Sequence, residues 1–247
     1  MIKISAVSYL NTKPFLHGLE ISKLRNIELS LDMPSEVARK LLENEVDLGL
    51  IPVAVIPLLK EAYIIPGYCI GADGPVESVK LYSKVPLAEI KTVLLDYQSR
   101  TSVALARILA TELWNISPEW KKAETGFEEK ISGATAGVVI GDRTFTMNGN
   151  FPYEFDLSEE WKRLTGLPFV FACWVSNKPL PSEFIQEFSA AMETGLNGIK
   201  DVVSKESIKY LPFNVENYLL QSLNLRLDER GEAAIALFLD KLKHLLP

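Results

Sequence analysis

Short apolar runs alternate with amphipathic segments along most of the chain. The run Ile2–Val7 opens it as a strand, and residues 27–31 alternate apolar and polar positions as a half-exposed strand does. A segment that begins at Pro14 and the run from Pro34 to Leu42 have the spacing of amphipathic helices. Strand and helix therefore take turns, which is typical of α/β proteins.

A second alternating series begins at residue 92. Thr92–Asp96 predicts a strand, and the apolar spacing from Val103 to Ala110 predicts a helix after it. The buried run Ala136–Ile140 ends in Gly-Asp and resembles the run Asp47–Pro52 in the first half of the chain. This pattern indicates two α/β units of similar construction.

Three further apolar runs, at residues 63–71, 78–83 and 167–175, predict strands. We place the first crossover between the units just after the strand 78–83, and the return crossover in 167–175. Two crossovers imply two lobes with a central ligand cleft that closes by hinge motion.

The expected lobes are residues 1–86 together with 176–247, and residues 87–175. The hinge candidates are the two strands around 78–83 and 171–176.

The last third of the chain shows helical patterns. Asp156 precedes a helix with acidic residues in its first turn, and Gly166 has the position of a left-handed C-terminal cap. From Ser182 to the end we expect helix, interrupted at Leu211–Phe213, with a final amphipathic helix from Glu229 to Leu245.

Polar side chains follow the first strand, at the end where open α/β sheets bind ligands. Ser8, Asn11 and Thr12 carry hydroxyl and amide groups that can donate to a carboxylate, and the start of a helix adds to that attraction. The same residue types also serve as ordinary helix N-caps, and spacing alone does not separate the two roles.

A second polar loop has the same place in the second unit. Ser99, Arg100, Thr101 and Ser102 follow the strand at 92–96 and offer three hydroxyls and one guanidinium. By itself this pattern also fits a helix cap with a solvated arginine. If both loops face one cleft, two opposed anion sites fit a small dicarboxylate.

Composition and motifs exclude several classes of function. The chain has 247 residues, is 47% hydrophobic and carries a net charge of -6, which disfavours nucleic acid as a partner. Its two cysteines form no CxxC pair, so we expect two buried thiols, and the two histidines are expected to be structural or surface groups.

The chain contains no HExxH, GxSxG, P-loop or GxGxxG motif, so we expect no metal and no cofactor. Asp142 stands at a strand end, where an acid, a base or a loop cap is found. No long apolar stretch predicts a membrane span, and the start of the chain shows no leader, so we expect a cytoplasmic protein unless a leader was removed.

Several of these segments together resemble the chorismate dehydratases of the futalosine route to menaquinone. The opening segment Ser8–Pro14 carries the resemblance first, and the sibling dihydroxynaphthoate synthases open with a Ser-Pro-Cys-Pro-Asn-Asp type of segment instead. The other matching segments are Gly74-Pro75-Val76, Ser78-Val79, Ser99–Val103, Ile140–Asp142, Asp156-Leu157, Trp161 and Thr165–Ala172.

The resemblance implies a type II periplasmic-binding-protein fold and an enzyme that removes water from chorismate. It implies catalytic positions for Asn11 and Ser78, around the reacting carbons. Because the sequence offers no convincing histidine base, our hypothesis for the proton acceptor is the substrate's own side-chain carboxylate, with a protein group as the alternative. The remaining expected substrate-binding residues are Ser8, Tyr9, Ser99, Arg100, Thr101, Ser102, Gly141 and Asp142. The rival interpretation is a non-catalytic solute-binding protein for a small carboxylate, and the oligomeric state is left open.

Overall fold

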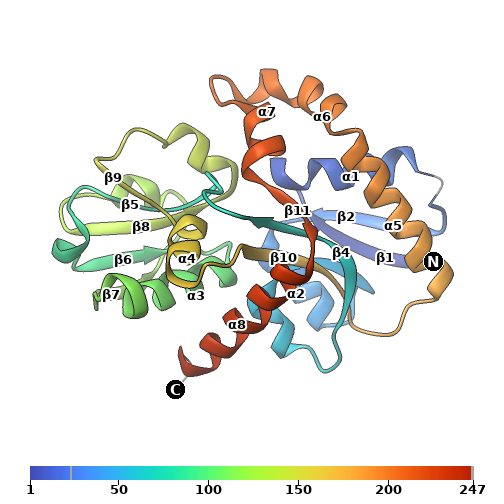
Figure 1. The fold of residues 1–247 in the computed structure, drawn as a ribbon, viewed down its shortest axis with the longest axis horizontal. Helices are drawn as coiled ribbons and strands as arrows, with labels where there is room; N and C mark the ends of the chain where they lie inside the picture. The colour runs from blue at the N-terminus through green and yellow to red at the C-terminus, as the bar shows by residue number, and fades with distance from the viewer. Residues whose placement is uncertain (23, 246–247) are drawn as a thin grey trace.

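The chain forms two α/β lobes, each built on one mixed sheet (Figure 1). The computed structural model describes residues 1–22 and 24–245, so Lys23, Leu246 and Pro247, which the expected first lobe includes, lie outside the described residues. The strand order is β11-β4-β10-β3-β1-β2 in the first sheet and β7-β6-β8-β5-β9 in the second.

The strands of the first sheet are β1 (Ile2–Val7), β2 (Ile27–Asp32), β3 (Leu48–Pro52), β4 (Tyr63–Ala72), β10 (Phe169–Ser176) and β11 (Asn224–Leu227). Those of the second are β5 (Val79–Ser83), β6 (Thr92–Leu95), β7 (Glu119–Lys122), β8 (Thr135–Ile140) and β9 (Tyr153–Asp156). The longer helices are α1 (Lys13–Ile21), α2 (Pro34–Leu42), α3 (Arg100–Leu109), α4 (Leu157–Thr165), α5 (Ser182–Asn197), α6 (Ile199–Glu206) and α8 (Glu229–Leu245).

The shorter helical segments are η1 (Leu10–Thr12), η2 (Val53–Leu58), η3 (Leu87–Glu89), η4 (Ala110–Trp114), η5 (Phe127–Lys130), η6 (Gly141–Thr146), η7 (Ser207–Tyr210), α7 (Val215–Asn217) and η8 (Tyr218–Ser222).

The two sheets repeat one arrangement, which confirms the predicted fold class. In the first, β1 lies between β2 and β3 and is parallel to both, and in the second β6 lies between β7 and β8 in the same way. An antiparallel strand follows in each sheet, β10 beside β3 and β5 beside β8. The two similar runs at 47–52 and 136–142 therefore occupy equivalent places as β3 and β8.

The chain changes sheets at places that differ from the predicted boundaries. Strand β5 pairs with β8 and β9 in the second sheet, whereas β10 pairs with β3 and β4 in the first. Residues 79–86 therefore go with the second lobe and 169–175 with the first. An alternating strand pattern does not specify its partner, because pairing is decided by the rest of the sheet.

The stretches that link the lobes are residues 73–78 and 166–168 rather than the two predicted hinge strands, which are hydrogen-bonded inside the sheets. The links lie side by side, since Phe169 pairs with Ala72. Asp156 ties the first link to the start of α4: its carboxylate accepts a hydrogen bond from the Glu77 N–H at 2.7 Å and caps α4 through the Ser158 N–H at 3.0 Å.

Most local predictions are confirmed. Helix α2 spans Pro34–Leu42, Asp156 caps α4, and Gly166 ends that helix with a φ of 75°. Both cysteines are buried free thiols. The prediction of helix from Ser182 onward is wrong at Asn224–Leu227, which forms strand β11 beside β4. None of the described helices is both long and apolar enough to cross a membrane.

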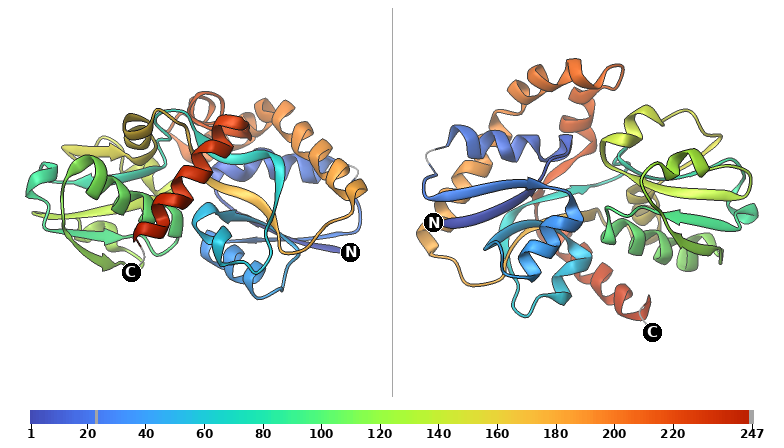
Figure 2. Two further views of the ribbon diagram at one scale, coloured as in Figure 1. Left: turned by 60° about the horizontal axis from the view of Figure 1, so that its bottom comes forward. Right: turned by 180° about the vertical axis from the view of Figure 1, so that it is seen from behind.

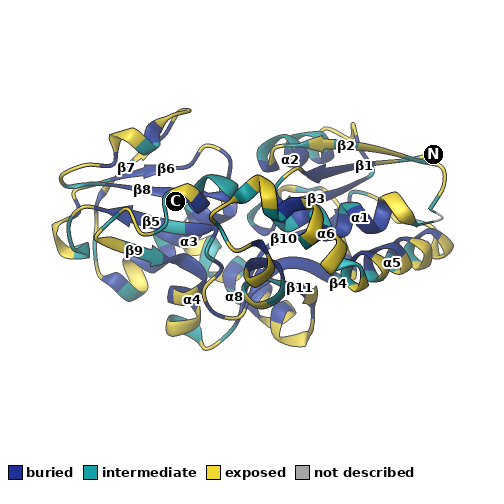
Figure 3. Ribbon diagram, turned by 90° about the horizontal axis from the view of Figure 1, so that it is seen from above, coloured by how far each residue is buried: buried dark blue, intermediate teal, exposed yellow. Residues whose placement is uncertain are grey.

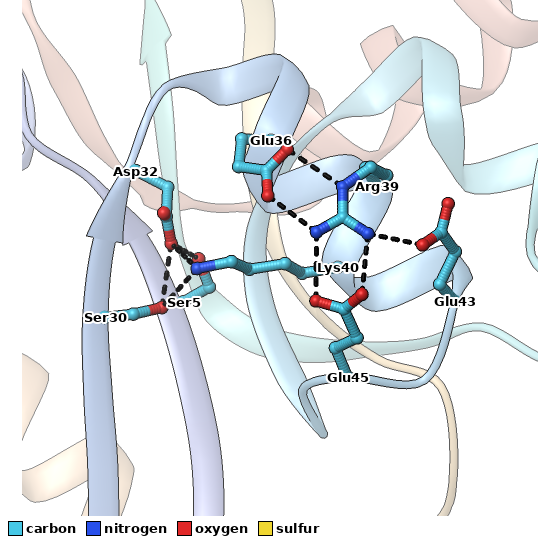
Figure 4. Close-up of polar contacts among 8 residues, drawn as sticks. All are labelled: Ser5, Ser30, Asp32, Glu36, Arg39, Lys40, Glu43 and Glu45. Atoms are coloured by element: carbon cyan, nitrogen blue, oxygen red, sulfur yellow. Dashed lines mark hydrogen bonds and ion pairs between the residues drawn. The ribbon is translucent and has the colours of Figure 1, made fainter.

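A polar network ties the last turn of α2 to the first sheet (Figure 4). Asp32, at the end of β2, accepts hydrogen bonds from Ser5 and Ser30 and pairs with Lys40 of α2 at 2.6 Å. Burial tends to raise the pKa of Asp32, but these donors outweigh it and lower that pKa. The network therefore connects β1, β2 and α2.

The two lobes share one apolar core. The central strands of both sheets, among them β3, β8 and β10, are buried (Figure 3). Helix α8 lies across the junction between the lobes (Figure 2), where its Phe238 packs edge-on against Trp161 and Phe169. Helix α8 therefore contacts both lobes, through β10 in the first and α3 in the second.

Candidate functional site

A cavity lies between the two lobes, lined by residues from both. Its polar lining consists of Tyr9, Asn11, Thr12, Ser78, Ser99 and Ser102. The rest of the lining is Val7, Pro34, Leu50, Pro52, Ile70, Val76, Val79, Ile140, Gly141, Phe171 and Ala172. Strands β1, β3 and β8 all point their carboxyl ends at it, as open α/β sheets do at ligand sites.

The lining is neutral. Among the described residues that surround the cavity, none carries a carboxylate, an imidazole or a positively charged group. An anionic ligand would be held there by hydroxyl, amide and backbone groups, and the cavity offers no protein base.

The expected site residues divide into two groups. Those that line the cavity are Tyr9, Asn11, Ser78, Ser99, Ser102 and Gly141. Those that lie outside its lining are Ser8, Arg100, Thr101 and Asp142.

In the opening loop, the side chains do not act as helix caps. No side chain caps η1 or α1, although Thr12 stands at the N-cap position of α1. Its hydroxyl donates instead to Asn11 Oδ1 at 3.1 Å, while Ser8 is exposed. The Asn11 and Thr12 side chains therefore remain at the cavity, and the capping alternative fails for this loop.

In the second loop, the serines that form the N-terminal cap of α3 also line the cavity. Ser99 is the N-cap of α3: its Oγ accepts from the Ser102 N–H at 3.0 Å, and the two hydroxyl oxygens lie 2.9 Å apart. Thr101 faces the first lobe, where its Oγ1 accepts from the Ala54 N–H at 3.2 Å. Arg100 is exposed and lines a separate surface hollow with Arg107.

Several contacts hold the lobes closed beside the cavity. The Tyr9 hydroxyl donates to Gln98 Oε1 across the cleft. Asp142 accepts from the Leu10 N–H at 3.1 Å and from the Tyr210 hydroxyl at 2.8 Å. Burial raises the pKa of Asp142, while these two hydrogen bonds act to lower it. Asp142 thus connects the two lobes through these hydrogen bonds, and its side chain does not line the cavity.

Tyr218 is a residue of this site that sequence reasoning missed. It lies in η8, is fully buried, and its hydroxyl donates to Ser78 Oγ at 2.8 Å. The two residues are 140 positions apart, and the sequence around Tyr218 has only a helical pattern. Gln98 and Tyr210 were missed for the same reason, because no local signal marks a contact between lobes.

Comparison with known proteins adds independent findings. The family described as menaquinone biosynthesis matches residues 2–244. The curated chorismate dehydratase of Thermus thermophilus is 29% identical over 233 residues, which cover 85% of this chain and 84% of that protein.

Solved structures show the same fold. A protein from Archaeoglobus fulgidus superposes with a TM-score of 0.79 at 14% identity, covering 99% of this chain and 97% of the other. The alkanesulfonate-binding protein of Xanthomonas axonopodis pv. citri superposes with a TM-score of 0.68 at 13% identity, covering 100% and 94%. With the fold of solute-binding proteins and a family match across nearly its whole length, the chain belongs to the menaquinone biosynthesis family.

Proposed function

We propose that this protein is a chorismate dehydratase, which converts chorismate to 3-[(1-carboxyvinyl)oxy]benzoate and water. The likeness to the Thermus thermophilus enzyme and the family match support this activity. The observation that carries it is the neutral cavity between the lobes, which offers hydrogen-bond donors from both sides to a dianionic guest.

The reaction needs little driving force from the protein. Loss of the ring C3 proton and the C4 hydroxyl makes the ring aromatic, so the enzyme must mainly orient the substrate and stabilise developing charge. We assign Asn11 and Ser78 to the polar groups around the reacting carbons, and Ser99 and Ser102 to a carboxylate.

The proton acceptor in this proposal is the substrate's own side-chain carboxylate. A carboxylate that is moved from water into a cavity without a cation becomes more basic, because burial disfavours its charged form. The neutral lining of this cavity provides that environment. In this stepwise elimination the C3 proton passes to that carboxylate, which then gives it to the departing C4 hydroxyl. Water leaves, the carboxylate is restored, and the step balances without a cofactor.

Substrate entry requires the lobes to open, since the cavity lies between them. We propose residues 73–78 and 166–168 as the hinge, because within the described residues the chain passes between the two sheets at these places. A biosynthetic role also favours the cytoplasm as the location of the protein.

A direct assay tests the proposed function. Purified protein is mixed with chorismate, and the mixture is followed by liquid chromatography beside a protein-free sample that reports spontaneous rearrangement. We expect the dehydrated benzoate to form in proportion to the amount of protein. Chorismate that binds in calorimetry but is recovered unchanged would instead identify a non-catalytic solute-binding protein.

A further inference from the structure

The hydroxyl of Tyr218 is directed at the polar wall of the cavity without lining it. Tyr218 is 1% exposed and packs its ring edge-on against Phe145, with 5.1 Å between the ring centroids. A phenylalanine would fill the same space. A buried hydroxyl is costly unless it is hydrogen-bonded, so its partners indicate what it does.

Its neighbours are the two polar residues assigned to the reacting carbons. The Tyr218 hydroxyl donates to Ser78 Oγ at 2.8 Å, and the Ser78 and Asn11 side chains act to lower the pKa of Tyr218, which burial raises. Both Ser78 and Asn11 line the cavity. Tyr218 therefore links two walls of the site, since Asn11 follows β1 and Ser78 lies in the first link between the lobes.

The direction of these hydrogen bonds matters, because a hydroxyl has one proton to give. Tyr218 gives its proton to Ser78 Oγ, while Asn11 Oδ1 accepts from the Thr12 hydroxyl at 3.1 Å. Ser78 Oγ is thereby occupied as an acceptor, and its own proton is free for the cavity.

We propose that Tyr218 is a positioning residue for the dehydration: it holds Ser78 as a hydrogen-bond donor that points at the substrate. This inference rests on the proposed function. Because Ser78 Oγ accepts a hydrogen bond from Tyr218, its own proton becomes a better donor to the leaving hydroxyl or to developing charge.

The first test replaces Tyr218 by Phe and compares it with Tyr82→Phe. Tyr82 is equally buried, donates to Asn148 Oδ1 at 2.7 Å and lies outside the cavity lining. We expect Tyr218→Phe to lower kcat about tenfold or more with KM changed less than about twofold. Tyr82→Phe should lower the melting temperature by as much as Tyr218→Phe does, but it should leave kcat unchanged. Equal kcat values in the two variants would overturn the proposal.

The second test asks whether Tyr218 acts through Ser78. In a Ser78→Ala background the partner is gone, so Tyr218→Phe should change kcat less than about twofold there, far less than in the wild-type protein. The same loss in both backgrounds would show that Tyr218 acts by another route and would overturn the inference.

The third test separates this inference from the proposed function. If the wild-type protein binds chorismate without dehydrating it, the proposed function fails. The affinity for chorismate is then measured by calorimetry for the wild type, Tyr218→Phe, Ser78→Ala and the double variant. Coupling between Tyr218→Phe and Ser78→Ala in that affinity would still support the positioning role, and additive losses would overturn it.

Discussion

Tyr9 in the first lobe lies so close to Gly141 in the second that a Cβ atom placed on Gly141 would be 2.9 Å from the tyrosine ring. Gly141 also has a φ of 71°, in the left-handed region that side chains rarely adopt. This contact exists only when the lobes are closed. A glycine at this position therefore serves both the turn after β8 and the closure of the cavity.

Gly141→Ala should consequently impair turnover more than it impairs folding. Gly149 is the control, because its φ of 82° imposes the same backbone strain with nothing within 4 Å of an added Cβ. The strain costs each variant about 1–2 kcal/mol of unfolding free energy, whereas only Gly141→Ala should lower kcat/KM, by about tenfold or more. Steady-state kinetics and thermal melts check this, and equal kcat/KM in both variants would contradict the closure role.

Asn11→Ala and Ser78→Ala should abolish most turnover while leaving the protein folded. Each removes a polar group from the cavity wall, and the loss of one donor to developing charge typically lowers kcat by about 100-fold. Ser204→Ala, an exposed serine on α6, is the control for the change of residue type. The measurement is product formation from chorismate beside circular dichroism, and full turnover in both cavity variants would refute these roles.

Arg100→Ala tests whether an arginine binds the substrate carboxylate. The pattern of the second loop suggested that role, but Arg100 is exposed and lies outside the cavity lining. We expect KM for chorismate to stay within about twofold of the wild-type value, since an exposed charge away from the ligand contributes little. A tenfold rise in KM at constant kcat would show that the guanidinium reaches the substrate after all.

Asp156 should make stability depend on pH in a recognisable direction. Burial raises the pKa of its carboxyl to about 6, against opposing hydrogen bonds from backbone N–H groups. The folded state then holds a proton that the unfolded state has already lost, so the unfolding free energy falls as pH rises from about 4 through 6.

Asp156→Asn keeps the shape and removes the ionisation. Relative to this variant, the wild-type protein should lose about 1–3 kcal/mol of unfolding free energy between pH 4 and 7. Urea titrations across that range measure the difference, with Asp240→Asn as the exposed control. Parallel profiles for wild type and Asp156→Asn would mean that this carboxyl does not titrate in the window.

Many of the helices and strands were predicted from the sequence, because the signals that define them act over only a few neighbouring residues. Proline at the start of α2 and glycine after α4 act through the backbone of a few neighbouring residues. Apolar periodicity likewise predicted β6 and β8. The short strands β9 and β11 escaped prediction, because four residues in a strand are defined by the partner beside them.

From its residues alone, the sequence determined most of the order of strands and helices, the two polar loops and the kind of chemistry that they offer. Only the tertiary structure decided where the chain passes between lobes, that Arg100 lies outside the cavity, and that Tyr218 meets Ser78. The physical reason is that propensity and capping act within a few residues. Sheet pairing and lobe closure instead bring together groups more than a hundred residues apart, which no local pattern records.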